Sequence, residues 1–375
     1  MIPPRIAIVG HDAGHNPLGR ALVLADLLDL VGDVRIVAFG DRLWPPAVGG
    51  RPVELLGPPH TTAGLPGAVR RLGAAVRDAD IIVAVKPRIL SYGLASLVHH
   101  RRPLILDVDD LEYLFTRRRL GWLRQFIEPD REPVTRLLER WRRPVAALTV
   151  ASRALQRRYG GTWLPHVRDR SLLASQAQRS GPATRVRLGL DAAFVVGFVG
   201  TVRPHKGLTV LADAVGRLGG DSRLLLAGDL GDDQDVEALA TRTGGRLVTA
   251  AGPSMREIGA ILGACDVVAI PQSISLEAEY QAPAKLLDAL AAGRPIVTSD
   301  VGDAAELLGG AGRLVPPDDP ATLAAVLAEL RDNQAMRARL GEAALARTTA
   351  AFALERWRAT VADVVAPLLV GGGGT

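Results

Sequence analysis

The chain has 375 residues, 48% of them hydrophobic and 23% charged, which indicates an ordinary globular protein of about two domains that needs no disulfide framework. Its one cysteine, Cys265, is interpreted as a small core residue, and because we recognise no signal peptide and no apolar run of about 18 residues, we expect a cytoplasmic protein. The net charge of +5 is modest and dispersed, and with no nucleic-acid-binding motif recognised we expect no nucleic-acid partner.

Near-continuous apolar runs alternate with helical patterns in the first half of the chain. Such runs are typical of strands buried on both faces of a parallel sheet. Asn16 is expected to cap the first helix, with Pro17 in its first turn and Gly32 at its end. The alternation predicts a doubly wound α/β domain. Its predicted strands are Arg5–Val9, Val34–Phe39, Asp80–Val85, Pro103–Val108 and Ala146–Val150.

Helix-breaking residues separate this half from a second one. Gly160-Gly161, Pro165 and the Gly181-Pro182 pair interrupt any long element. We therefore expect an N-terminal domain over residues 1–180 and a C-terminal domain over residues 181–350. Residues 351–375 are expected to form a helix that packs back on the N-terminal domain, followed by a flexible glycine tail.

The same alternation restarts after the boundary. Apolar residues at spacings of three and four predict an amphipathic helix from Leu208 to Leu218. Ser254 and Glu257 have the spacing of a capping box at the start of another helix. The predicted strands of this half are Phe194–Val199, Arg223–Ala227, Arg246–Thr249, Asp266–Ile270 and Pro295–Thr298.

The strongest functional signal is Gly200-Thr201-Val202-Arg203-Pro204-His205-Lys206-Gly207, which leads from a predicted strand into a predicted helix. A helix N-terminus carries unpaired N–H groups and a partial positive charge, and glycines let the backbone approach an anion closely. Arg203 and Lys206 add two full charges, in a chain with three lysines among its 45 basic residues. The segment therefore predicts a diphosphate site, and the alternative is an ordinary turn with solvated charges.

A second segment, from Glu277 to Pro295, also leads from a loop into the start of a helix. Lys285 and Asp288 lie three residues apart and so share a face of that helix. On these residues alone, the segment fits a local Lys–Asp pair on a solvated face as well as it fits a ligand site.

Together, the two segments resemble the donor half of the large retaining GT-B glycosyltransferase family, usually called family 4, which includes sucrose and glycogen synthases and bacterial mannosyltransferases. The family's Arg/Lys-Gly phosphate segment is similar to Arg203…Lys206-Gly207. Its Glu-Ala-Met-Ala-x-Gly-x-Pro segment is similar to residues 288–295, Asp-Ala-Leu-Ala-Ala-Gly-Arg-Pro. The resemblance, from Ile6 to about Leu308, implies two Rossmann-like, doubly wound parallel-sheet domains that face a cleft, with the acceptor in the first and the nucleotide-sugar donor in the second.

The resemblance also implies roles for individual residues. Arg203 and Lys206 would hold the diphosphate and assist its departure, and Asp288 would accept hydrogen bonds from the ribose. The remaining donor-binding positions would be backbone around the base at Gly252, Pro253 and Ser254, backbone facing the sugar and phosphates at Ala282, Pro283 and Ala284, and also Thr201, Gly228 and Lys285. No cofactor or metal ion is expected, because the two cations neutralise the diphosphate.

Two positions depart from the family's pattern. Its paired Glu-x7-Glu becomes Tyr280 and Asp288, which leaves the identity of the sugar open. Its His-Asp pair after an N-terminal strand becomes Asp109-Asp110. Asp109 is a catalytic candidate that would position the acceptor or stabilise positive charge at the anomeric carbon, and Asp110 is an acceptor-side candidate. The alternative is a polar strand end with Asp110 capping the next turn.

Further candidates lie in the first half of the chain. Asp107-Val108-Asp109 has the Asp-x-Asp pattern of metal-dependent, single-domain transferases, an alternative that the cationic diphosphate site disfavours. Lys86 follows a predicted strand and is either an acceptor-side residue or a surface charge. In the loop after the first strand, Gly14 is expected near the donor, and the acceptor-side candidates are His11, His15 and Asn16.

The arginine-rich stretch 117–143 contains apolar side chains and is a candidate for peripheral contact with an anionic membrane; the alternative is a solvated helical insertion. The sequence thus predicts a glycosyltransferase that moves a hexose from a UDP- or GDP-sugar to an unidentified small-molecule or lipid-linked acceptor, with retention of configuration. Two alternatives are a nucleotide-sugar epimerase of the same fold, which needs no acceptor, and a non-catalytic nucleotide-sugar-binding protein.

Overall fold

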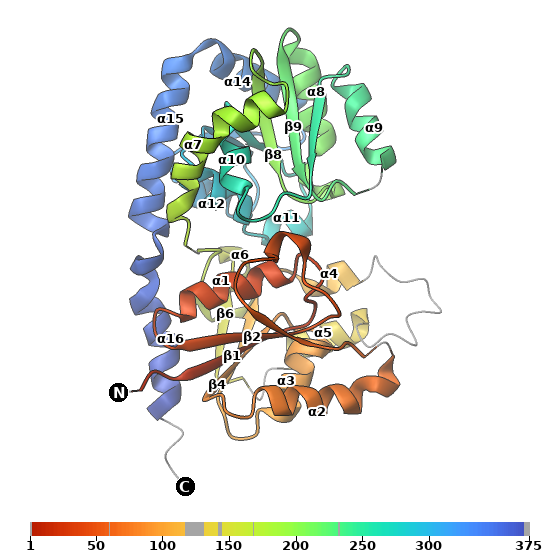
Figure 1. Cartoon of the computed structure of the whole chain (residues 1–375), viewed down its shortest axis with the longest axis vertical. Coiled ribbons are helices and arrows are strands. Elements are labelled where there is room, and N and C mark those ends of the chain that lie inside the picture. The colour runs from red at the N-terminus through yellow and green to blue at the C-terminus, as the bar shows by residue number, and fades with distance from the viewer. Residues whose placement is uncertain are drawn as a thin grey trace. The chain divides into compact units, whose positions relative to one another are not determined.

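The structure is a computed structural model that describes residues 2–59, 61–116, 131–141, 145–167, 169–231 and 233–370. The chain forms two compact α/β units (Figure 1). Unit 1 comprises Met1–Arg168 and Leu354–Thr375, and unit 2 comprises Asp169–Ala353. Each unit is built on its own parallel sheet, so the predicted pair of doubly wound domains is confirmed.

Unit 1 has a seven-stranded sheet in the order β3-β2-β1-β4-β5-β6-β7, with every neighbouring pair parallel. The chain order reverses at β1, which lies between β2 and β4, and doubly wound sheets bind ligands at the carboxyl edge near such a reversal. The strands are β1 (Arg5–Gly10), β2 (Asp33–Phe39), β3 (Val53–Leu56), β4 (Ile81–Val85), β5 (Leu104–Val108), β6 (Ala147–Val150) and β7 (Thr162–Trp163).

The central strands of unit 1 are covered on both faces, because every residue of β4 and β5 is buried. The last helix belongs to this unit: Arg358 donates to the carbonyl of Leu30, and the Trp357 ring meets the Trp163 ring edge-on at 5.4 Å between centroids. The α-helices are α1 (Leu18–Leu28), α2 (Leu65–Ala75), α3 (Leu94–Val98), α4 (Glu112–Thr116), α5 (Glu132–Arg140), α6 (Arg153–Tyr159) and α16 (Arg358–Val370), and the short turns are η1 (Pro45–Ala47), η2 (Thr62–Gly64), η3 (Ile89–Gly93) and η7 (Leu354–Trp357).

Unit 2 has a six-stranded parallel sheet in the order β10-β9-β8-β11-β12-β13. Its strands are β8 (Phe194–Val199), β9 (Ser222–Gly228), β10 (Leu247–Ala251), β11 (Val267–Ile270), β12 (Ile296–Ser299) and β13 (Arg313–Val315). Its helices are α7 (Ser171–Arg187), η5 (Pro204–Lys206), α8 (Leu208–Leu218), α9 (Asp233–Arg242), α10 (Ile258–Gly263), α11 (Leu276–Tyr280), α12 (Ala284–Ala291), α13 (Ala304–Leu308), α14 (Pro320–Asp332), α15 (Gln334–Arg347) and η6 (Thr348–Phe352).

The hydrophobic core on one side of the unit 2 sheet joins β8 to α8 and α14. Leu211 and Val215 of α8 and Leu327 of α14 are fully buried against Phe198 of β8. Cys265, between α10 and β11, is also buried, as predicted, and its thiol donates to the carbonyl of Ile261. Among the described residues, no helix is long and apolar enough to cross a membrane.

Contrary to the prediction, the Gly181-Pro182 pair lies inside a continuous helix. Helix α7 continues through both residues, and the units divide before it, between residues 168 and 169. Gly181 packs directly on Gly263 of α10, where a Cβ atom would lie 2.6 Å from the Gly263 carbonyl carbon. Backbone-to-backbone contact of these two helices therefore requires glycine here, and tertiary packing overrides the local preference against helix.

The expected cap of the first helix is also wrong. Helix α1 begins at Leu18, its N-cap position is Pro17, and no side chain caps it. Asn16 is exposed, and it is its backbone carbonyl that accepts a hydrogen bond, from the N–H of Gly19 at 2.9 Å. The backbone carbonyl of Asn16 thus accepts an N–H group of the first helical turn, in place of the Asn16 side chain.

Candidate functional site

Three glycines bring the ends of β8, β9 and β10 together at the carboxyl edge of the unit 2 sheet. Gly200 follows β8, Gly228 ends β9 and Gly252 follows β10. A Cβ atom on Gly228 would lie 2.8 Å from the carbonyl carbon of Gly200, so the two loops touch through their backbones. The N–H of Gly252 donates to the carbonyl of Gly228 at 2.9 Å. The predicted positions Gly228 and Gly252 therefore lie next to the Gly200–Gly207 segment.

Gly207 turns the chain from this segment into α8. It occupies the N-cap position with a left-handed φ of 64°, and a Cβ atom there would lie 2.9 Å from the carbonyl carbon of Pro271, just after β11. Glycine is favoured on both counts. The N-terminus of α8 is thereby held at the ends of β8 and β11, with Arg203 and Lys206 in the segment that leads into it.

Lys206 and Lys285 converge on this segment from different elements. Lys206 is 8% exposed, and its ammonium contacts Oε1 of Gln281, which follows α11. Lys285, in the first turn of α12, places Nζ 3.7 Å from the centroid of the Phe198 ring. A Cβ atom on Gly200 would lie 2.7 Å from the same nitrogen. The structure thus brings Lys285, which the sequence assigned to the donor site, up to the segment that holds the other two cations.

The ammonium of Lys285 is buried, and within the part of the chain that the structure describes it has no hydrogen-bond partner. Burial, reinforced by the charges of Lys206 and Arg203, lowers the pKa of Lys285 well below its usual 10.5. Three basic side chains gathered at one strand edge are an arrangement that an anion would stabilise.

Asp288 forms an ion pair that the sequence did not reveal. Its Oδ1 accepts a hydrogen bond from Nε of Arg170 at 2.8 Å, and the Arg170 side chain is only 4% exposed. Arg170 immediately precedes α7 and lies 118 residues away in the chain, so no helical spacing signals the pair. A local pair of Asp288 with Lys285, one of the two sequence-based interpretations, is not formed.

The other predicted donor positions lie on the loops around these cations. Ser254 follows β10, and both its N–H and its hydroxyl contact the Glu257 carboxylate, at 2.9 and 2.8 Å. Of the predicted capping box, the bond from the Ser254 N–H to the Glu257 carboxylate forms. Ser254 is not the N-cap residue, however, because α10 begins at Ile258 with Glu257 at its N-cap. Of the remaining positions, Pro253, Ala282 and Pro283 are buried, and Thr201 and Ala284 are half-buried.

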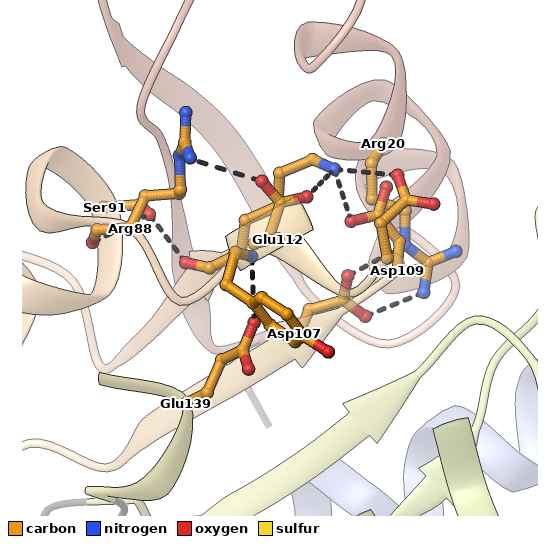
Figure 2. A network of polar contacts seen from close by, with 10 residues as sticks. Arg20, Arg88, Ser91, Asp107, Asp109, Glu112 and Glu139 are labelled. Atoms are coloured by element: carbon orange, nitrogen blue, oxygen red, sulfur yellow. Dashed lines mark hydrogen bonds and ion pairs between the residues drawn. The ribbon is translucent and has the colours of Figure 1, made fainter. Parts of the chain in front are cut away.

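In unit 1, a buried lysine joins the ends of two neighbouring strands. Lys86 follows β4 and is 5% exposed, and its ammonium lies among carboxylates that follow β5, of which Figure 2 labels Asp109 and Glu112. Nζ lies 2.7 Å from Asp109, 3.3 Å from Asp110 and 2.5 Å from Glu112. The interpretation of Lys86 as a surface charge is therefore wrong. The predicted residues Lys86, Asp109 and Asp110 form one cluster, together with Glu112, which the sequence analysis did not single out.

The carboxylates of this cluster have the spacing of a cation site. Oxygen atoms of Asp109, Asp110 and Glu112 lie within 4.8 Å of one another. The ammonium of Lys86 is in contact with all three, so in this structure the protein supplies the cation itself. Asp110 thus contacts Lys86.

Asp107, the first residue of the Asp-x-Asp pattern, is used inside the unit. It forms a two-pronged ion pair with Arg20 of α1, at 2.7 and 2.8 Å, and accepts from the Thr149 hydroxyl at 2.7 Å. Figure 2 shows this pair, and both charged side chains are essentially inaccessible to solvent. Because its oxygens are committed to these partners, Asp107 does not face the Lys86 cluster as a metal ligand would.

Burial perturbs the acid groups around the cluster. It raises the pKa of Glu112 to about 6, against the opposing charge of Lys86. Burial also raises the pKa of Glu139, which accepts hydrogen bonds from the Tyr113 N–H at 3.3 Å and the Tyr159 hydroxyl at 3.2 Å. For Lys86 itself, burial lowers the pKa but the surrounding carboxylates, Asp109 foremost, raise it more, so the net shift is upward.

The loop after β1 is held by Asp12. Its carboxylate accepts from the N–H of Gly14 and contacts Nδ1 of His15, both at 2.9 Å. His11 is buried at 7% exposure, whereas His15 and Asn16 are exposed. Gly14 is buried, and a Cβ atom there would meet its neighbours at 3.6 Å or more, so the protein's own packing does not require glycine at this position.

Most of the predicted membrane-contact stretch, residues 117–143, lies outside the described residues. Its described part, 131–141, contains α5, where Arg136 stacks over the Tyr113 ring at 4.2 Å and pairs with Glu132 at 2.8 Å.

Comparison with known proteins agrees with this geometry. Residues 193–333 match the model of the family described as Glycosyl transferases group 1. The chain is 35% identical over 170 residues to the MMP alpha-(1->4)-mannosyltransferase of Mycolicibacterium hassiacum, covering 44% of this chain and 39% of that protein. It is 32% identical over 201 residues to the D-inositol 3-phosphate glycosyltransferase of Streptomyces coelicolor, covering 48% and 42%. The chain thus spans about two fifths of the length of these curated relatives.

Solved structures resemble the whole chain. Anabaena Alr3699/HepE, crystallised with UDP and glucose, has a TM-score of 0.76 and 21% identity, covering 97% of this chain and 100% of its own. Sucrose-phosphate synthase from Thermosynechococcus elongatus has a TM-score of 0.73 and 18% identity, covering 98% and 100%. At such identities the likeness establishes the fold. The chain therefore has the GT-B fold, and residues 193–333 of unit 2 match the glycosyl transferases group 1 family.

Proposed function

We propose that this chain is a glycosyltransferase that moves a hexosyl group from a UDP- or GDP-sugar to an acceptor, with retention of anomeric configuration. The observation that carries the proposal is that Lys285 reaches the segment between β8 and α8, which carries Arg203 and Lys206. Such a site fits the two adjacent phosphates of a nucleotide sugar. The likeness to a protein crystallised with UDP-glucose supports the same class of donor.

The chemistry follows from where charge develops. As the bond between the sugar and the diphosphate breaks, negative charge grows on the phosphate oxygens, and fixed cations stabilise it more than they stabilise the intact donor. We assign this role to Arg203 and Lys206. We assign acceptor binding to unit 1, where Asp109 and Asp110 follow β5 and the His11–Asn16 loop follows β1. Asp109, held at 2.7 Å from Lys86, would position an acceptor hydroxyl.

A melting-temperature panel of UDP, GDP, ADP and dTDP tests the proposal directly. We expect UDP or GDP to raise the melting temperature, because a ligand at about 100 times its dissociation constant stabilises a protein by about 2.7 kcal/mol. The responding nucleotide then identifies the donor for a transfer assay. If none of the four changes the melting temperature, the donor-site assignment is wrong. Product formed from donor alone would favour an epimerase, and binding without turnover a non-catalytic binding protein.

We further propose that transfer needs no divalent metal ion. The cations of unit 2 would neutralise the diphosphate, and the carboxylates of the Lys86 cluster already contact an ammonium. Transfer in the presence of EDTA should therefore match transfer in the presence of added Mg²⁺ or Mn²⁺. Loss of activity in EDTA that either ion restores would contradict this proposal and direct attention to Asp109, Asp110 and Glu112 as ligands.

A further inference from the structure

We propose that the donor site takes up a proton from solvent when it binds a nucleoside diphosphate, and that the proton is bound by the amine of Lys285. The inference rests on the proposed function and adds a property to its site: Lys285 would become the site's third cation only when the ligand binds. In the step, the –NH2 group of Lys285 gains one proton from water or buffer and becomes –NH3⁺, and no other bond is made or broken.

The geometry around Lys285 disfavours its charged form in the absence of an anion. Nζ is buried against the face of Phe198, 3.7 Å from the ring centroid, and it has no hydrogen-bond partner among the described residues. A cation–π contact compensates a buried ammonium only in part. Gly200 also lies close to the amine, since a Cβ atom there would be 2.7 Å from Nζ.

The charged groups near Lys285 act in the same direction. Arg203 and Lys206, from the segment between β8 and α8, both lower the pKa of Lys285 through repulsion. The acidic residue of its own helix, α12, is Asp288, and the Asp288 carboxylate accepts a hydrogen bond from Arg170. Gln281, after α11, is uncharged and contacts Lys206, and His205 is buried in the same segment as Lys206. Burial and repulsion together thus keep the pKa of Lys285 below its usual range.

A bound diphosphate reverses this balance. Its negative charges offset Arg203 and Lys206 and offer oxygen acceptors, so the pKa of Lys285 rises on binding. Between the lower pKa of the unliganded protein and the higher pKa of the complex, binding is linked to proton uptake. In that window the dissociation constant should increase up to about tenfold per pH unit as the pH rises. Below it, Lys285 is protonated in both states and the uptake disappears.

Calorimetric titration in buffers of different ionisation enthalpy measures the uptake, as the slope of binding enthalpy against buffer enthalpy. The probes are UDP and GDP at about pH 8.5, where a terminal phosphate with a pKa of about 6 is already ionised and releases no proton. UDP-glucose, whose two phosphates carry no such titrating group, is a third probe. We expect an uptake approaching about one proton per site as the pH passes through the window.

Three variants assign the proton. Lys285→Arg keeps a cation that does not titrate, so it should bind UDP or GDP without uptake. Lys285→Met should lose both the uptake and on the order of tenfold to a hundredfold in affinity. It should also fold, because it removes a buried polar nitrogen that has no hydrogen-bond partner among the described residues, and the melting temperature without ligand reports this. His205→Gln, a neighbouring titratable residue, should retain the uptake.

The outcomes separate this inference from the proposed function. Binding with no net protonation at any pH tested, or uptake that survives in Lys285→Arg, would overturn the inference and leave the glycosyltransferase proposal intact. Uptake lost in His205→Gln but kept in Lys285→Arg would assign the proton to the histidine. If no probe binds, the donor site itself is misassigned and the inference falls with it.

Discussion

We expect Lys206→Ala to lower kcat/KM for sugar transfer by about 30-fold to 1,000-fold, a loss of about 2–4 kcal/mol of transition-state stabilisation. Lys206 is buried, and its ammonium is held against Gln281 at the entry to α8, so its position is fixed before the donor arrives. A fixed charge in a buried site stabilises the departing diphosphate without reorganising at the moment of reaction. Steady-state kinetics with the donor found in the nucleotide panel measures the loss.

A matched control for this variant is Arg242→Ala. Arg242 is also a cation of unit 2, but it lies on α9, is 47% exposed and pairs with Asp213. Surface pairs of this kind contribute little, so transfer by Arg242→Ala should equal that of the wild type. Wild-type transfer rates in Lys206→Ala would refute the assignment of the diphosphate site, whatever the fold.

The second large effect is expected in stability. Lys86→Met should lower the free energy of unfolding by about 3–5 kcal/mol at neutral pH, because it leaves buried carboxylates without their cation. The pKa of Lys86 is raised in the folded protein, so its stabilising contribution is present below the usual 10.5 and is lost only as the pH rises through the higher folded value. The wild-type interaction therefore persists throughout the neutral range.

The deficit in Lys86→Met should shrink on acidification. Burial already holds the pKa of Glu112 at about 6, and removal of Lys86 raises it further. A carboxyl group whose folded pKa is raised favours folding below its unfolded pKa of 4.5 and loses that contribution as the pH rises through the folded value. Urea unfolding at about pH 5 should therefore show a smaller deficit than unfolding at about pH 8.

Arg136→Ala is the control for this measurement. Arg136 pairs with Glu132 on the surface of α5 and is 45% exposed, so its removal should cost little at either pH. An equal deficit for Lys86→Met at both pH values would show that the lost stability comes from packing of the lysine stem rather than from the unbalanced carboxylates. No deficit at all would mean that the cluster rearranges or hydrates without cost.

Much of the fold follows from local patterns. The buried central strands, from Arg5–Gly10 to Ile296–Ser299, were predicted because they are short apolar runs separated by helices. The missed strands β3, β7 and β13 lie at sheet edges, are two to four residues long and are only partly buried. A strand that exposes one face and pairs on one side carries a weak apolar signal, so local pattern does not distinguish it from a loop.

In the candidate site, too, some features follow from local sequence and others from packing. The Arg203–Gly207 segment could be recognised as a candidate from local sequence, because a strand, glycines, cations and a helix start are contiguous in the chain. The partners of the charged side chains became apparent only from the folded structure. Asp288 pairs with Arg170 from 118 residues away, and Lys86 meets its carboxylates because β4 and β5 are neighbours. Lys285, on α12, reaches Gly200, which follows β8 and lies 85 residues earlier in the chain. A buried charge selects its partner by proximity in space, which strand order and helix packing set and local spacing does not encode.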